Sequence, residues 1–323
     1  MTAVNLSCAL PPSRDTAEQI AIAEKLGYAR AWCYDSPALY PDVWMALGLA
    51  AHQTATIGLG PAVLVPSLRH PMVNAAAIAG LADLAPGRVA AAIGAGFTGR
   101  YTLGRRAMRW SDVADYVRVL RSLLRGEEAS WEGAAIKMLE RDPVDVPLII
   151  AGDGPKGRAV AAELGDGIFG AGLPPLGDGL PDWRGILLFG TVLDEGEDLR
   201  SDRVIAAAGH ALAVVYHGLY ERSPEAVDAM PGGAQWRAAI EEVPAERRHL
   251  AVHEGHLVRV TERDRPAVLA GADLLPAVSF TGTAAQLRER AAELAEAGVT
   301  EIAIQPGGPD IAGELERMMA ALG

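Results

Sequence analysis

The sequence predicts a closed α/β barrel with eight parallel strands, the (β/α)8 TIM barrel, in a chain of 323 residues. Strand-like and helix-like stretches alternate with short links, as in βαβ units. The strand-like runs are almost continuously apolar, which is typical of parallel strands buried on both faces. About eight such runs occur, the number that closes a barrel. An open doubly wound sheet is the alternative, and it is weakened because no GxGxxG turn follows the first run.

The predicted strands are recognised as apolar runs bounded by glycine, proline or polar residues. In chain order they lie within 3–10, 29–35, 57–71, 88–96, 146–152, 165–172, 184–193 and 299–308. The third run, "IGLGPAVLVPSLRHP", begins as a buried strand and is then interrupted by Gly58, Gly60 and Pro61. Glycine weakens a strand unless something must approach its backbone closely, so this interruption calls for an explanation.

Helical periodicity and end signals place the predicted helices between these strands. Asp15 and Glu18 have the spacing of a capping box, as do Thr283 and Gln286, and Ser111 is the predicted N-cap of an amphipathic helix. The helices are predicted over 15–27, 42–54, 70–87, 111–126, 156–164 and 283–298.

Two segments depart from the strand–helix alternation. Residues 196–276 are helix-rich and polar, and we interpret them as an insertion between the seventh and eighth strands of a single domain over 1–323. Residues 173–182 are rich in glycine and proline, which indicates a loop at the barrel mouth or a plain linker.

Composition excludes several classes of function. The formal net charge of −12 disfavours binding to a nucleic-acid backbone. No apolar run reaches the roughly 18 residues of a membrane span, and the first residues lack the features of a signal peptide. The two cysteines, Cys8 and Cys33, fall in strand-like runs. A reduced cytoplasm explains them better than a disulfide, so we expect a cytoplasmic protein.

Candidate site residues are sought at the carboxyl ends of the strands, where barrels of this kind carry their sites. Most of these ends are glycine or alanine, which lets a flat ligand lie against the backbone. Asp35 and Ser36 end the second strand, and Phe97 and Thr98 follow Gly96 after the fourth. We expect the substrate pocket to include these last two residues together with the following pair: Cys8 and Tyr40.

The segment "AGDGPKG", residues 151–157, is the sharpest single signal. Its glycines allow unusual backbone angles, and Pro155 suits the first turn of a helix. The free N–H groups of that helix start would face an anion, and Lys156 adds a positive charge. A phosphate site and an ordinary turn are both compatible with this pattern.

A metal site is not predicted. His253 and His256 in "HEGH" have usable spacing, but no third ligand is apparent and Gly255 disfavours a rigid helix. His70, before Pro71, is interpreted as a helix cap rather than a base. Motifs of hydrolases and kinases are lacking.

Four segments resemble the luciferase-like monooxygenase superfamily, and within it the branch that uses the deazaflavin coenzyme F420. They are 23–36, 54–96, 149–169 and 280–304, which span most of the barrel. The resemblance implies a bacterial luciferase-like barrel whose third strand ends in a bulge with a non-prolyl cis peptide bond. By position this bond is Ala62–Val63, and the bulge would press on the middle ring of the cofactor.

The resemblance also implies the site residues. Catalytic roles fall to Asp35 and Ser36. Cofactor binding is assigned to the strand ends and the glycine-rich turn, that is, to Asp35, Ala62, Val63, Gly94, Gly96, Gly152, Asp153, Gly154, Pro155 and Lys156. Several F420-dependent relatives have histidine where this chain has Ser36, and some have an acidic residue where it has Phe97 or Thr98. The proton-transfer route is therefore open.

The predicted function is an F420-dependent oxidoreductase that transfers a hydride between the deazaflavin and a small organic substrate, with a homodimer left open. An FMN-dependent monooxygenase on the same fold is the first alternative, and a non-catalytic barrel that binds a flavin or deazaflavin is the second. An arginine cluster at the rim favours F420, whose glutamate tail is anionic. It consists of Arg69, Arg100, Arg105, Arg106 and Arg109.

Overall fold

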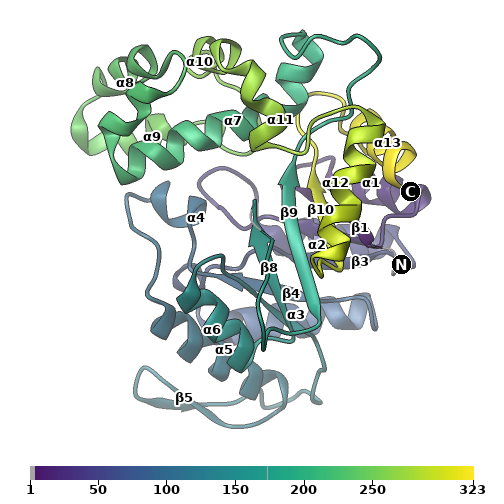
Figure 1. Ribbon diagram of the computed structural model, residues 1–323. Helices are drawn as coiled ribbons and strands as arrows, with labels where there is room; N and C mark the ends of the chain where they lie inside the picture. The colour runs from purple at the N-terminus through teal and green to yellow at the C-terminus, as the bar shows by residue number, and fades with distance from the viewer. Residues whose placement is uncertain (1–3, 173) are drawn as a thin grey trace.

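A computed structural model describes residues 4–172 and 174–323 of the chain (Figure 1). Eight parallel strands form one sheet in the order β3–β2–β1–β10–β9–β8–β7–β4. Each corresponds to one of the eight predicted runs. The strands are β1 Asn5–Leu10, β2 Arg30–Cys33, β3 Gly58–Pro61, β4 Ala91–Gly94, β7 Leu148–Ala151, β8 Gly167–Ala171, β9 Trp183–Phe189 and β10 Glu301–Gln305. Ala3, which the first predicted run included, lies outside the described residues.

The two edge strands, β3 and β4, meet and close the barrel. Parallel bridges join Leu59 to Val89 and Leu64 to Ile93. The backbone N–H of Leu64 donates to the carbonyl of Ala92 at 2.8 Å. The TIM-barrel prediction is thus confirmed.

The interrupted third strand has a local explanation at this seam. A Cβ atom built on Gly60 would lie 1.8 Å from the carbonyl oxygen of Ala90, so only glycine permits the close approach of β4. The peptide bond Ala62–Val63 is cis, as the resemblance predicts. Beyond it the chain pairs again with β4 through Leu64.

Helices cover the outside of the barrel. They are α1 Thr16–Leu26, α2 Val43–Gln53, α3 Pro71–Leu84, α4 Thr98–Tyr101, α5 Trp110–Leu124, α6 Pro155–Leu164, α12 Ala284–Glu296 and α13 Ile311–Leu322. A short hairpin, β5 Ala129–Trp131 with β6 Ala134–Ile136, was not predicted. The described residues contain no helix with the length and apolar character that crossing a membrane requires.

Helix ends differ in part from the prediction. Thr283 and Gln286 form the capping box at the start of α12. Asp15 precedes α1 in a helical backbone conformation and makes no capping hydrogen bond, so the first predicted box was wrong. Helix α5 starts at Trp110 rather than after Ser111, and Arg109 occupies the N-cap position.

The floor of the barrel is filled by aromatic side chains around one carboxylate. Glu301 accepts hydrogen bonds at 2.7 Å from the indole N–H groups of both Trp32 and Trp183. The ring of Phe169 packs edge-on against Trp32, with centroids 5.6 Å apart. This packed floor separates the carboxyl ends of the strands from a smaller pocket at their amino ends, beside Trp183 and Glu301.

The insertion between the seventh and eighth strands lies over those carboxyl ends, above the arrowheads of β8 and β9 in Figure 1. It contains α7 Asp202–Arg222, α8 Gly233–Glu241, α9 Arg248–Val252, α10 Arg265–Ala270 and α11 Leu275–Val278. Its apolar side chains form a cluster separate from the barrel core, around Leu212, Tyr216 and Trp236. Of the predicted loop 173–182, residues 174–182 contain neither helix nor strand, and Leu173 lies outside the described residues.

Candidate functional site

A cavity of about 430 Å³ opens at the carboxyl ends of the barrel strands, below the insertion. Its volume is within the range of small-molecule sites. The walls are mostly apolar and small, because many of the lining positions are glycine or alanine. Those positions are Ala9, Ala62, Gly94, Ala95, Gly96, Gly99, Ala107, Ala151, Gly152, Gly170 and Ala171.

Two of these glycines leave little room for a side chain. Gly96 has a φ of +77°, and a Cβ there would lie 2.5 Å from the Cγ1 atom of Val65. A Cβ on Gly94 would lie 3.2 Å from the Cγ2 atom of Val63. The backbone itself therefore forms part of the cavity wall, as a flat ligand requires. Ala62, Val63, Gly94 and Gly96 all line the cavity, where they were predicted to be.

Asp35 and Ser36 lie together in the cavity wall at the end of β2, and both are buried. The Asp35 carboxylate forms an ion pair with Arg69, which also donates to Asp42 at 2.7 Å. Burial raises the pKa of Asp35, and the hydrogen bond from Arg69 opposes that shift. Arg69 is thus held by two carboxylates, so it is not a free rim cation as the sequence suggested.

Two residues assigned to the substrate pocket do not line the cavity. The side chain of Cys8 points away from the cavity and packs in the main hydrophobic core. Side chains alternate along β1, and it is the neighbouring Ala9 that lines the cavity. Burial raises the pKa of the Cys8 thiol. Tyr40 lies behind the wall, where its hydroxyl donates to the carbonyl oxygen of His256 at 2.9 Å. It therefore supports a residue of the cavity wall rather than forming that wall.

Phe97 and Thr98, which were predicted to belong to the substrate pocket, line the cavity. Thr98 is buried, and Phe97 is 41% exposed. The Phe97 ring lies 4.7 Å from that of Tyr101 and 6.1 Å from that of His256, measured between centroids. Phe97 thus stands at the border between the barrel and the insertion.

The glycine-rich turn is only partly in the cavity wall. Gly152 and Asp153 line the cavity, whereas Gly154, Pro155 and Lys156 lie just beyond its described wall. Gly154 is the N-cap of α6, and a Cβ there would meet no atom within 4 Å. Asp153 accepts a hydrogen bond from the N–H of Ala171, and burial raises its pKa. The free end of α6 therefore borders open space next to the cavity.

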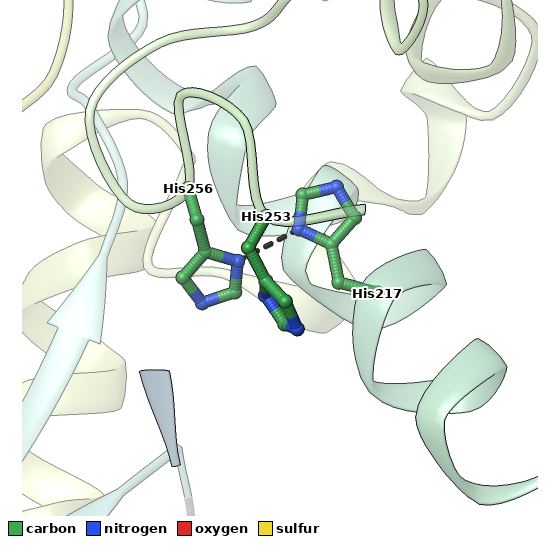
Figure 2. Close-up of side chains that lie close together, drawn as sticks. All are labelled: His217, His253 and His256. Carbon is green, nitrogen blue, oxygen red and sulfur yellow. Dashed lines mark hydrogen bonds between the residues drawn. The ribbon is translucent and has the colours of Figure 1, made fainter. Parts of the chain in front are cut away.

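A cluster of three buried histidines adjoins the cavity (Figure 2). His217 comes from α7, while His253 and His256 come from the turn after α9. In that turn Gly255 has a φ of +65°, which folds the chain back and brings the two rings to 5.1 Å. Sequence analysis identified the second and third of these residues but missed His217. One pattern in the sequence could have pointed to His217. It follows His210 by seven positions, a spacing that places both histidines on one face of a helix, and both are buried in α7.

The three histidines each offer a nitrogen within 4.8 Å of the others, so a metal ion is a geometric option. However, the Nδ1 atoms of His217 and His256 are 2.7 Å apart. Two imidazole ligands of a tetrahedral zinc ion lie about 3.3 Å apart, given Zn–N bonds of about 2.0–2.1 Å. A distance of 2.7 Å instead fits an N–H···N hydrogen bond.

The fold and the site together define a barrel with an apolar cavity whose wall is partly formed by backbone. The sequence model of the luciferase-like monooxygenase family matches residues 3–183. The chain therefore belongs to the luciferase-like monooxygenase family, which confirms the resemblance.

Relatives with named activities are similar over different lengths. The chain is 26% identical to a 5,10-methylenetetrahydromethanopterin reductase from Archaeoglobus fulgidus, over 90% of this chain and 89% of that protein. It is 32% identical to an F420-dependent glucose-6-phosphate dehydrogenase from Beutenbergia cavernae, over 48% of this chain and 51% of that protein. These names support the prediction that this chain is an oxidoreductase.

Solved structures share the fold. The coenzyme F420-dependent tetrahydromethanopterin reductase from Methanopyrus kandleri aligns with a TM-score of 0.69 at 20% identity, over 99% of each chain. An F420-dependent secondary alcohol dehydrogenase in complex with an F420–acetone adduct aligns with a TM-score of 0.67 at 18% identity, over 99% of this chain and 98% of that one. At these identities the likeness establishes the fold alone.

Proposed function

We propose that the protein binds coenzyme F420 and transfers a hydride between the deazaflavin and a small organic substrate. The observation that carries this proposal is the cavity wall made partly of backbone, where a side chain at Gly94 or Gly96 would crowd Val63 or Val65. A flat tricyclic ring fits such a wall. The relatives named as F420-dependent add support from sequence.

The residues of this chain would hold the cofactor along its length. Ala62 and Val63 would lie against the ring, and Asp35 would accept a hydrogen bond from a ring N–H, since all three residues line the cavity. The N-terminus of α6, with the N–H groups after Gly154, would hold the phosphate, because a helix start favours negative charge. Asp153 turns its carboxylate to the N–H of Ala171, so it is directed to the backbone rather than to that phosphate.

When bound, F420 supplies the hydride acceptor or donor, and the protein supplies position and exclusion of water. The insertion and Phe97 cover the cavity from the side of solvent. Arg105 and Arg106, both exposed on the loop between α4 and α5, would meet the anionic tail. Ala107, next in the chain, lines the cavity, which places this loop at its mouth.

The test is a titration of the purified protein with F420 and with FMN, followed by fluorescence and absorbance. We expect saturable binding of F420 that is tighter than binding of FMN. Tighter binding of FMN would contradict the proposal and support a flavin-dependent monooxygenase. Binding of F420 without hydride exchange toward any reductant or oxidant would support a non-catalytic carrier.

A further inference from the structure

His256 belongs both to the cavity wall and to the buried histidine cluster. Its backbone is held at two carbonyl groups although it lies in a turn. The carbonyl of His256 accepts from Tyr40, and the next carbonyl, of Leu257, accepts from the side chain of Gln305. Figure 2 shows its Nδ1 directed at His217 and its other ring nitrogen pointing away from the cluster. The ring is therefore fixed between the insertion and the cavity.

A buried carboxylate lies behind His217. The Oδ1 atom of Asp264 is 3.5 Å from His217 Nε2 and accepts from the indole N–H of Trp236 at 2.8 Å. Its Oδ2 atom accepts from the hydroxyl of Thr261 at 2.7 Å. Burial opposes ionisation, but the hydrogen bonds from His217, Trp236 and Thr261 outweigh it and lower the pKa of Asp264. Asp264 is thus an ionised acceptor in a fixed position.

This carboxylate sets the tautomer of both histidines. Because Asp264 only accepts, His217 carries its proton on Nε2, and its Nδ1 is left with a lone pair. The 2.7 Å contact between the two Nδ1 atoms then requires His256 to donate from Nδ1. In a neutral imidazole the second nitrogen is an acceptor, so Nε2 of His256 presents a lone pair away from the cluster.

The surroundings of His256 favour its neutral form. Burial lowers the pKa of His256 and of His217, and each ring disfavours a charge on its neighbours. The other titratable groups around it are His253, whose Nε2 lies 3.0 Å from Glu221, and the buried His210. The described cavity wall also contains two carboxylates, and each has a partner. Asp35 forms an ion pair with Arg69, and Asp153 accepts a hydrogen bond from the N–H of Ala171.

We propose that His256 is the catalytic base of the cavity and that its substrate is an alcohol, with His217 and Asp264 as positioning residues. This proposal rests on the proposed F420 function. As the alcohol carbon loses a hydride to the oxidised deazaflavin, its hydroxyl proton passes to Nε2 of His256. The C–H and O–H bonds break, a C=O bond forms, and the deazaflavin gains two electrons. In the reverse direction the same nitrogen returns the proton to a carbonyl oxygen.

The tautomer is tested first, on the protein alone. Nitrogen-15 NMR of histidine-labelled protein should show His256 protonated at Nδ1 and bare at Nε2, and His217 protonated at Nε2. Asp264→Asn should disturb this pattern, whereas His253→Asn should leave it in place. A proton on Nε2 of His256, or one equivalent of tightly bound zinc or cobalt with all three histidines as ligands, would overturn the proposal.

The catalytic role is tested on the F420-loaded protein with 2-propanol, cyclohexanol and glucose 6-phosphate as probes. His256→Asn should lower kcat by about 10²–10⁴-fold, measured at saturating F420 so that any change in F420 affinity is separated from the loss of turnover. His217→Asn and Asp264→Asn should shift the pH profile of kcat, and His253→Asn serves as the matched control in the same cluster. Circular dichroism melting establishes that each variant is folded, with His256→Gln as the second variant.

The two levels of proposal fail in different ways. Absence of F420 binding by the wild type would refute the proposed function and leave the NMR result standing. F420 binding with no oxidation of any of the three alcohols would refute the alcohol assignment. Full activity of a folded His256→Asn variant would refute the catalytic role alone.

Discussion

Gly60 shows how one residue type can be required by the closure of the whole sheet. The position lies in β3, where its missing side chain makes room for the carbonyl oxygen of Ala90 in the opposite edge of the barrel. The sequence pointed to this feature, because glycine and proline interrupt an otherwise apolar strand. Which atom makes the close approach depends on the pairing of β3 with β4, and that pairing follows only from the closed barrel.

We expect Gly60→Ala to lower the free energy of unfolding by about 3 kcal/mol, the upper end of the usual cost of overpacking, since the new methyl group would overlap backbone atoms that cannot rotate away. Urea unfolding followed by circular dichroism measures this change. Gly48→Ala is the matched control: Gly48 lies inside α2, and a Cβ there meets nothing within 4 Å. That variant should gain about 0.5–1 kcal/mol from helix propensity. Similar effects at both positions would contradict the structural account.

The residues of the candidate site were predictable to different degrees. Those at strand ends, such as Asp35 and Gly96, could be placed because parallel strands in a barrel end on the same side. Cys8 was misplaced by one position in the alternation of its strand, because a run of apolar residues does not reveal which side faces inward. His217 was missed because it is 36 positions from His253 in the chain, and only the packing of α7 on the turn joins them.

Among the elements, the turn between β7 and α6 has room for a ligand just outside the described cavity wall. Gly154 faces open space, and its φ of −85° is accessible to any residue. A larger side chain at this position is therefore compatible with the fold but would occupy the volume in front of the helix start. Stability and ligand binding can thus be separated at this position.

We expect Gly154→Leu to weaken F420 binding at least tenfold, with an unchanged melting temperature. Lys156→Ala should weaken it less, and this smaller effect should fade as salt rises, because a solvated lysine contributes a screened charge. Fluorescence titration and thermal melting measure the two quantities. Wild-type affinity in Gly154→Leu would place the phosphate elsewhere.

Helix α1 is joined to the segment before β3 by a single carboxylate. The Oε1 atom of Glu24 accepts from the backbone N–H groups of Ala55, Thr56 and Ile57 at 2.6–2.9 Å. Partial burial opposes ionisation, but these hydrogen bonds outweigh it and lower the pKa of Glu24 to about 2. Its pKa in the folded state is thus below the ordinary value of 4.5.

A lowered carboxyl pKa stabilises the fold above the unfolded value and loses that effect as pH falls toward the folded value. We therefore expect Glu24→Gln to be less stable than wild type at neutral pH. The difference should shrink between about pH 4.5 and about pH 2, where Glu24 becomes protonated. Urea unfolding across this range measures it, with the exposed Glu128→Gln as control. A difference that does not change with pH would rule out this role of Glu24.

Most elements were predictable because their signals are local. Apolar runs located all eight barrel strands, and helical periodicity located α1, α2, α3, α5, α6 and α12. Helix α13 was not predicted, and the helices of the insertion were not placed one by one. Helix caps were predicted less reliably. Thr283 forms the predicted hydrogen bonds with Gln286, three positions later, whereas Asp15 forms no capping hydrogen bond although Glu18 also follows it by three positions. The difference lies in the backbone of Asp15, which is already helical and so turns its side chain from the free N–H groups. Sequence spacing does not encode that angle.

At the scale of the whole molecule, charge is unevenly distributed on an acidic protein. Arg105 and Arg106 are exposed on the loop at the cavity mouth, whereas Arg69 and Arg109 are paired with carboxylates. The predicted arginine cluster therefore carries fewer unpaired positive charges than its number of arginines suggests. Two exposed cations beside a cavity still attract an anionic tail at low ionic strength.

We expect the double variant Arg105→Ser/Arg106→Ser to bind F420 more weakly at low salt and to bind its tail-less analogue as the wild type does. The effect should decline as salt rises. The matched control is Lys25→Ser/Lys137→Ser, which removes two exposed cations from other parts of the surface. Titrations at two salt concentrations measure both. Equal loss for F420 and the analogue would show that the arginines do not meet the tail.

The insertion has a hydrophobic cluster of its own, centred on Leu212, Tyr216 and Trp236, while the cofactor cradle belongs to the barrel. Mutations inside one core therefore disturb the other only weakly. Over evolutionary time such an arrangement lets the helical lid drift, and with it the choice of substrate, under little constraint from the part that holds the cofactor. For protein engineers the same independence offers a place to recombine. Exchange of the lid at its junctions with β9 and α12 should leave the barrel part of the cofactor site in place, and it would replace the proposed proton-transfer residues His217, His256 and Asp264 together.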